Sequence, residues 1–165
     1  MPTIRPTAVP GPRSTDVHDG RQELPVPAHA LPHRSPRELI ALARHGLEEA
    51  ADTRTDGLRY AGAHLAALRA AAAVLAARAR SAPGRRGRLI SVWSLLVMVA
   101  PEFGEWASFF AAGASKRASA EAGIPRVVTA READDLLRAA EQFTAVVEVA
   151  LGLSYQPLLD SRLAS

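Results

Sequence analysis

LRYAGAHLAALRAAAAVLAARAR, residues 58–80, is the stretch that decides the fold. It consists mainly of alanine and leucine, and alanine favours helices because it loses no side-chain entropy there. Its apolar residues recur alternately three and four positions apart, a heptad-like seam typical of a helix that lies nearly parallel or antiparallel to its neighbours in a bundle. The seam consists of Leu58, Ala61, Leu65, Leu68, Ala72, Leu75 and Ala79.

Helix signals also appear on both sides of this stretch. Ser35-Pro36-Arg37-Glu38 and Thr129-Ala130-Arg131-Glu132 are capping boxes, which predict helices from 36 to about 52 and from 130 to about 151. Residues 91–100 are apolar nearly all round, so we expect a helix there at the centre of the fold. Pro101 predicts a break, followed by another helix that ends near Gly123.

These signals define one domain with two extensions. Residues 1–34 contain seven of the twelve prolines and no periodicity, which indicates a disordered arm. Residues 35–152 form the body, and residues 153–165 are expected to be a flexible tail. No strand pattern occurs in the chain. The fold class predicted is therefore an all-α, four- to five-helix up-and-down bundle.

Composition excludes several functional classes. The chain has no cysteine, which rules out disulfides and thiolate metal sites. The longest apolar run, Leu89 to Ala100, is too short to span a bilayer. The segment from Met1 to Arg13 holds four prolines and lacks the apolar core of a secretory signal. We therefore expect a cytoplasmic protein without a membrane partner.

The residue pattern does not indicate a metal or a cofactor. Di-iron bundles use paired Glu-x-x-His motifs on facing helices, and the nearest match here is the reversed His45-x-x-Glu48. Glycine loops that cradle phosphates, zinc patterns and nucleophile elbows are absent from the sequence. We therefore predict no bound metal and no cofactor.

Arg59 and His64 are the candidate catalytic pair. They form an Arg-x4-His pattern on the alanine-rich helix, in a region between Gly57 and Pro101 that has seven arginines and no acidic residue. In metal-independent RNA cleavage, a histidine can move a proton and an arginine can stabilise charge on the phosphate. Five helical residues turn through about 500°, so the two side chains point roughly 140° apart. They can meet at one phosphate through the reach of the arginine or across a dimer interface.

A basic stretch follows the same helix. Arginine side chains at the end of the helix and in the loop after it could contact a nucleic-acid backbone in a salt-dependent, sequence-independent manner. Aromatic residues are not interleaved with them, so base stacking is not indicated. The candidate nucleic-acid-binding residues are Arg78, Arg80, Arg85, Arg86 and Arg88.

Four segments resemble a small actinobacterial family of HEPN domains. They are Asp56–Ala61 with the alanine-rich helix, Val99–Trp106, Lys116-Arg117, and Glu121-Ala122-Gly123. The resemblance spans roughly residues 35–152, which is nearly the whole predicted body.

The HEPN resemblance implies an all-α bundle that is often dimeric. Many HEPN domains are metal-independent ribonucleases with an Arg-x4–6-His motif, which Arg59 and His64 match in spacing. Tyr60 stands where the motif usually has a polar residue, and the motif lies earlier in the bundle than is usual. Other HEPN domains bind nucleotides or act as non-catalytic partners. Two hypotheses therefore stay open: a homodimer that binds or cleaves RNA or nucleotides, and a non-catalytic interaction or dimerisation module.

Overall fold

The computed structural model describes residues 34–79 and 90–154. These residues form six α-helices and one short 3-10 turn, and no strand occurs among them. The predicted arm (1–34) and tail (153–165) lie almost entirely outside the described residues. The helices are α1 (Pro36–Asp52), α2 (Asp56–Arg78), α3 (Val92–Val99), α4 (Gly104–Ala112), α5 (Ala114–Glu121) and α6 (Ala130–Ala150), with the turn η2 (Pro101–Phe103) between α3 and α4.

The all-α class predicted from the sequence is confirmed, and so are both capping boxes. The backbone N–H of Ser35 donates to the Glu38 carboxylate at 2.7 Å, and the Ser35 hydroxyl accepts from the Glu38 backbone N–H at 3.2 Å. Thr129 and Glu132 make the same reciprocal pair at the start of α6. Each box satisfies two backbone donors that the first helical turn leaves free, which fixes where α1 and α6 begin.

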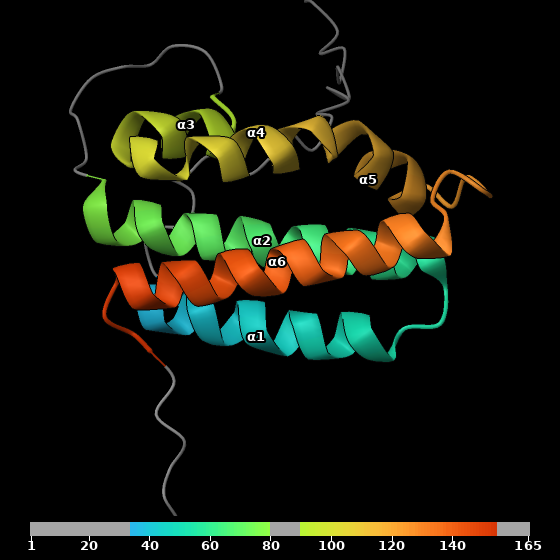
Figure 1. Ribbon diagram of the computed structural model, residues 1–165, viewed down its shortest axis with the longest axis horizontal. Helices are drawn as coiled ribbons and strands as arrows, with labels where there is room; N and C mark the ends of the chain where they lie inside the picture. Colours follow the sequence, from blue (N-terminus) through green and yellow to red (C-terminus); the bar gives the residue numbers. More distant parts are fainter. Residues whose placement is uncertain (1–33, 80–89, 155–165) are drawn as a thin grey trace, which may run out of the picture.

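Helix α2 is the central helix of the fold. Helices α1 and α6 pack along it on one side, and α3, α4 and α5 form a layer over the other side (Figure 1). By length and hydropathy α2 could span a membrane, but 67% of its most apolar window is buried inside the bundle. Its burial by helices on both sides is that of a core helix.

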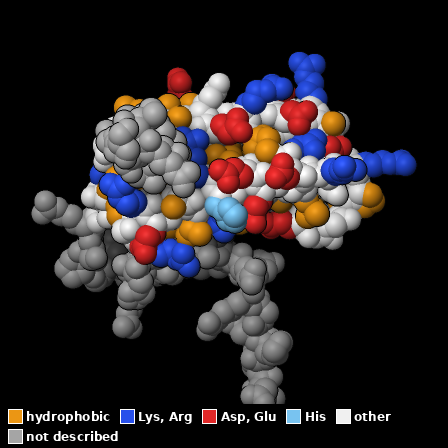
Figure 2. Space-filling model, turned by 90° about the horizontal axis from the view of Figure 1, so that it is seen from below, with side chains coloured by type: hydrophobic (Ala, Val, Ile, Leu, Met, Phe, Trp, Pro, Cys, Tyr) orange, Lys and Arg blue, Asp and Glu red, His pale blue; other side chains and the backbone are white. Residues whose placement is uncertain are grey.

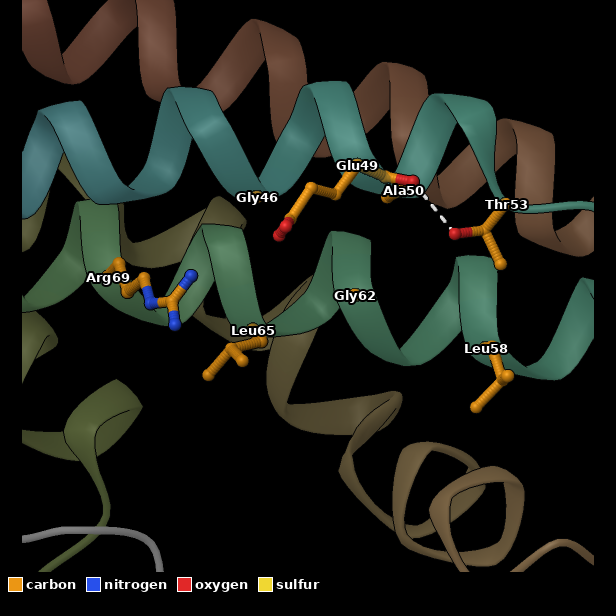
Figure 3. Close-up of a pocket in the computed structure, with 8 residues that line it drawn as sticks. All are labelled: Gly46, Glu49, Ala50, Thr53, Leu58, Gly62, Leu65 and Arg69. Atoms are coloured by element: carbon orange, nitrogen blue, oxygen red, sulfur yellow. Dashed lines mark hydrogen bonds between the residues drawn. The ribbon is translucent and has the colours of Figure 1, made fainter.

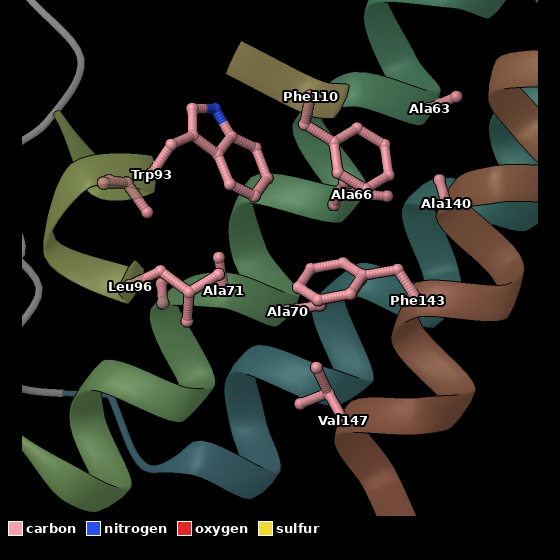
Figure 4. Packing of buried hydrophobic residues seen from close by; sticks show 14 of the residues in the cluster. Ala63, Ala66, Ala70, Ala71, Trp93, Leu96, Phe110, Ala140, Phe143 and Val147 are labelled. Carbon is pink, nitrogen blue, oxygen red and sulfur yellow. The ribbon is translucent and has the colours of Figure 1, made fainter. Parts of the chain in front are cut away.

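The core of the domain consists of a layer of alanines that is covered by aromatic rings. The alanines come from α2, and their small side chains allow the neighbouring helices to approach closely. The rings of Trp93, Phe110 and Phe143, from α3, α4 and α6, lie over this alanine layer (Figure 4). Trp93 and Phe110 stack with ring centroids 5.1 Å apart, and Phe110 and Phe143 are 5.4 Å apart. The fully buried alanines of α2 are Ala63, Ala66, Ala67, Ala70, Ala71 and Ala73.

Two details of the predicted helices were wrong. The helix expected at the centre is α3, which lies in the outer layer and leaves Val97 and Met98 exposed. The heptad seam on α2 is only partly buried, because Leu58 and Leu65 are 54% and 38% exposed. The reason is the same in both cases. The fully buried alanines of α2 allow close packing on both sides of this helix, so α2 takes the central position and the stripe with Leu58 and Leu65 stays open.

The helix predicted after Pro101 is divided in two at Gly113. A β-carbon at Gly113 would stand 2.7 Å from the Tyr60 hydroxyl and 3.6 Å from the His64 ring. Glycine is therefore required for α4 and α5 to lie against α2 at this point. This break is the reason that the domain has six helices where the sequence suggested four or five.

Candidate functional site

The guanidinium of Arg59 is largely enclosed and has two hydrogen-bond acceptors and two carboxylates beside it, although its Nε atom makes no hydrogen bond. Its side chain is 13% exposed, and it donates to the carbonyl oxygen of Thr53 at 2.9 Å and to the carboxylate of Asp56 at 2.7 Å. Asp134 on α6 lies 3.1 Å from its Nε atom. Arg59 therefore ties the start of α2 to the α1–α2 turn and to α6, and two carboxylates compensate its charge.

His64 lies in the interior of the domain. The residue is 1% exposed, and its Nε2 atom is 2.8 Å from the carbonyl oxygen of Phe110. Because a carbonyl only accepts, Nε2 must carry the proton, which leaves Nδ1 as a bare acceptor. Nδ1 is buried and has no hydrogen-bond partner. The rings of Trp93 and Phe110 face the imidazole edge-on, at 5.9 and 6.1 Å.

The structure does not bring Arg59 and His64 to one surface. Arg59 contacts the α1–α2 turn and α6, whereas His64 contacts α3 and α4. This divergence agrees with the roughly 140° that separates side chains five residues apart on a helix. In this arrangement the imidazole of His64 cannot touch a substrate in solvent, and the guanidinium of Arg59 is directed at groups of the domain itself.

Burial also sets the protonation state of His64. Desolvation lowers its pKa below the ordinary value of 6.5, the hydrogen bond to Phe110 opposes this, and the nearby Arg117 charge adds to the lowering. The imidazole is therefore neutral at pH 7. A neutral ring avoids a buried charge, while its unpartnered Nδ1 remains a cost to the core.

This lowered pKa predicts a pH dependence of stability. Below pH 6.5, His64 is protonated in the unfolded chain but stays neutral in the folded protein until the pH reaches its lowered pKa. The free energy of unfolding therefore decreases as the pH falls from 6.5 toward that pKa. The slope is at most about 1.4 kcal/mol per pH unit. Urea unfolding between pH 7 and pH 5 measures it. His64→Gln keeps an N–H for the Phe110 carbonyl and cannot titrate, so its stability should change much less over this range.

The basic stretch is only partly described. Arg78 pairs with the carboxylate of Glu102 and lies over the Phe103 ring, 5.8 Å from its centroid. Its guanidinium is therefore engaged within the domain. The other four candidates, Arg80, Arg85, Arg86 and Arg88, lie outside the described residues.

Most other cations near α5 and α6 also have acidic partners. Lys116 pairs with Glu132, and Arg117 lies 3.8 Å from Glu121. Figure 2 shows the face seen from below, where acidic side chains gather across the middle and basic ones lie toward the edges. The described side chains visible on that face form no continuous basic surface. Within the described ranges no three histidine or acidic side chains cluster in a way that could hold a metal ion.

A groove that sequence reasoning missed lies between α1 and α2. Its floor is made of glycine and alanine, and its edges carry two leucines, one carboxylate and one guanidinium (Figure 3). The signal for it was present in the heptad seam, because two of its leucines are the ones left exposed. The lining residues are Gly46, Glu49, Ala50, Thr53, Leu58, Gly62, Leu65 and Arg69.

A comparison with known families fits this helical architecture. A family model of HEPN domains, HEPN_SAV_6107, matches residues 50–148, from the end of α1 to the end of α6. The chain belongs to this HEPN family. The match covers more than half of the sequence and includes the whole of α2. No curated protein and no solved structure matches the chain. The HEPN assignment made from the sequence is thus confirmed, and it describes an all-α, HEPN-like protein.

Proposed function

We propose that this HEPN domain is a non-catalytic interaction module that works in the cytoplasm. One observation carries the proposal. The His64 ring is enclosed, neutral and hydrogen-bonded to the Phe110 carbonyl, so the imidazole of the HEPN-like motif has a structural role in the core. Metal-independent RNA cleavage needs that imidazole within hydrogen-bond reach of a hydroxyl or a leaving oxygen. Such contact would require α4 to separate from α2.

The engagement of Arg59 supports the same proposal. A guanidinium that stabilises a transition state must have N–H groups aimed at the phosphate. Two N–H groups of Arg59 donate to Thr53 and Asp56, and the Asp134 carboxylate lies 3.1 Å from its Nε atom. To bind a phosphate, Arg59 would have to give up two ion pairs and a backbone hydrogen bond. Its present contacts are those of a structural residue.

The outer layer of α3 and α4 supplies a surface for a protein partner. Met98, Val97 and Phe109 are 71%, 42% and 49% exposed there. The charged residues of these segments are Glu102, which pairs with Arg78, and Glu105. Exposed apolar side chains on helices without a basic residue favour an apolar protein surface over a phosphate backbone.

RNA binding without cleavage is the second candidate function. Segment 80–89 holds four arginines and no acidic residue, whereas acidic side chains slightly outnumber basic ones in the described residues. The positive charge that would attract a phosphate backbone is therefore concentrated in that segment. The arginines that would make the contacts are Arg80, Arg85, Arg86 and Arg88.

Cleavage and stability measurements on Arg59 variants test the primary proposal. The purified full chain should leave single-stranded and hairpin RNA intact at low salt. Arg59→Ala should lower the free energy of unfolding by about 2 kcal/mol, because it removes charge-assisted bonds from a largely buried side chain. Arg131→Ala is the matched control on α6, where the side chain is 92% exposed, and it should change stability by less than about 0.5 kcal/mol.

RNA cleavage by the parent would overturn the proposal if it were lost in a folded His64→Gln variant. If the parent binds RNA without cleaving it, and its affinity for RNA falls steeply as salt is added, the second candidate is favoured.

A further inference from the structure

One stripe of α2 lines the groove between α1 and α2 and carries a partly buried cation. The stripe contains Leu58, Leu65 and Arg69, whose spacings of seven and four residues place them on one face of the helix (Figure 3). The two leucines are 54% and 38% exposed. The groove has a volume of about 380 Å³, which lies within the range of about 300–1,000 Å³ that ligand sites occupy.

The guanidinium of Arg69 is held against α1. Its Nη1 atom donates to the carbonyl oxygen of Leu42 at 3.3 Å. A β-carbon on Gly46 would stand 3.1 Å from the same nitrogen, so the bare backbone of Gly46 leaves the room in which the guanidinium lies. Helix α1 thus fixes the position of Arg69, although this one long hydrogen bond uses only part of its donor capacity.

Arg69 has no acidic partner within residues 34–79 and 90–154. Glu49, the carboxylate on the α1 edge of the groove, lies 3.3 Å from His45 of its own helix. The other partly buried cations in the same ranges each have a carboxylate beside them, and they are Arg44, Arg59, Lys116 and Arg117. A partly buried guanidinium with unused N–H groups favours a carboxylate supplied by another molecule.

Charge and spacing together indicate what the groove accepts. A carboxylate bound at Arg69 would have its neighbouring atoms close to Leu65, which lies one helical turn away. Leu58 is seven residues before Leu65, about 10 Å along α2, and an extended peptide covers this distance in about three residues. A polypeptide that ends in an aliphatic residue, with a second one three positions earlier, therefore matches both leucines and the guanidinium.

We propose that the α1–α2 groove binds the C-terminal segment of a partner polypeptide that ends in an aliphatic residue. The terminal carboxylate pairs with Arg69, and the two aliphatic side chains pack on Leu65 and Leu58. Glu49 on the opposite edge repels an acidic residue between them and favours a neutral or basic one. The inference rests on the proposed function as an interaction module and names the chemistry of one partner.

A short peptide tests this groove directly. The probe is leucine–alanine–lysine–leucine, acetylated at its N-terminus and added to the ¹⁵N-labelled full chain in an NMR titration. It should bind with a dissociation constant at or below about 1 mM and shift the amide signals of the helix segments that line the groove. The same peptide with a C-terminal amide should bind about 10-fold more weakly, because it lacks the negative charge that pairs with Arg69.

A cycle between protein variants and peptide forms assigns the carboxylate to Arg69. Arg69→Gln should weaken binding of the acid peptide by about 10-fold and leave binding of the amide peptide within about 2-fold, a pattern that general destabilisation cannot imitate. Arg131→Gln on α6 is the matched control, because that side chain is 92% exposed, and it should leave both affinities within about 2-fold of the parent.

A second cycle tests the apolar contact. Leu58→Gln should weaken binding of the leucine peptide by about 5-fold and leave unchanged the binding of a peptide with alanine three positions before its end. The matched control changes Val97 and Met98 to glutamine on α3 and should stay within about 2-fold of the parent. Circular dichroism checks the folding of each variant.

Equal affinity for the acid and amide peptides, or unchanged binding in Arg69→Gln, would overturn the inference. So would the absence of signal changes at about 5 mM peptide, signal changes confined to α3 and α4, or displacement of the peptide by single-stranded RNA.

The two proposals fail separately. A chain that binds the peptide in the groove and also cleaves RNA removes the non-catalytic function and keeps the groove. A chain that does neither keeps the non-catalytic function and removes the groove.

Discussion

Phe110→Ala should lower the free energy of unfolding by about 3–5 kcal/mol, the largest loss that we expect from one truncation in this domain. Phe110 is fully buried, and its ring lies between those of Trp93 and Phe143. Removing it leaves a cavity beside the His64 ring and above the buried alanines of α2, whose short side chains cannot fill the space. Because small domains are stable by only about 5–15 kcal/mol, the variant should be close to unfolding at room temperature.

Urea unfolding followed by circular dichroism measures this effect. Phe109→Ala is the control, since it is the adjacent residue on α4 and 49% of it is already in water. Its loss should stay below about 1 kcal/mol. Equal losses in the two variants would mean that the aromatic cluster is not the centre of the core.

Glu148→Ala should be the second most damaging change, at about 2–3 kcal/mol. The Glu148 side chain is 7% exposed and accepts two hydrogen bonds from Arg44, one of them 2.8 Å long. This bidentate pair links α6 to α1. The Arg44 side chain is 39% exposed, so after the substitution it can turn toward water, which keeps the cost below that of a fully buried pair.

Replacement of both partners separates the cost of an unpaired charge from the cost of lost packing. Combining Arg44→Met with Glu148→Leu removes both charges and keeps similar volumes, so it should recover most of the stability lost by Glu148→Ala. Arg138→Ala breaks an exposed pair with Asp135 on α6 and should cost less than about 0.5 kcal/mol. A Glu148→Ala loss no larger than this control would show that the α1–α6 link is not stabilising.

Local signals predicted the boundaries of α1 and α6 well. Capping boxes depend on hydrogen bonds between residues three positions apart, so Ser35–Glu38 and Thr129–Glu132 could be interpreted without knowledge of any other helix. The break at Gly113 was missed, and the reason for a glycine there is tertiary, because a β-carbon would stand 2.7 Å from the Tyr60 hydroxyl on a different helix. Packing of one helix against another leaves little trace in the local sequence.

The candidate site shows the same limit. A two-residue motif such as Arg59-x4-His64 specifies a spacing along the chain but not what encloses each side chain. The Phe110 carbonyl that accepts from His64 is 46 residues after His64 in the chain. Asp134, the ion-pair partner of Arg59, is 75 residues after Arg59. Neither neighbour belongs to a recognisable pattern, so the residues alone left the catalytic and structural interpretations open.

The amino-acid sequence by itself determined the helical class, the ends of two helices and the HEPN family, because propensity, capping and family similarity are carried by residues close together in the chain. Tertiary structure decided which faces of the helices became buried. Alanines on α2 allowed other helices to pack closely on both of its sides, which enclosed His64 and left Leu58 and Leu65 in water. That choice depends on how closely whole helices can pack, and this is a property of their combined surfaces.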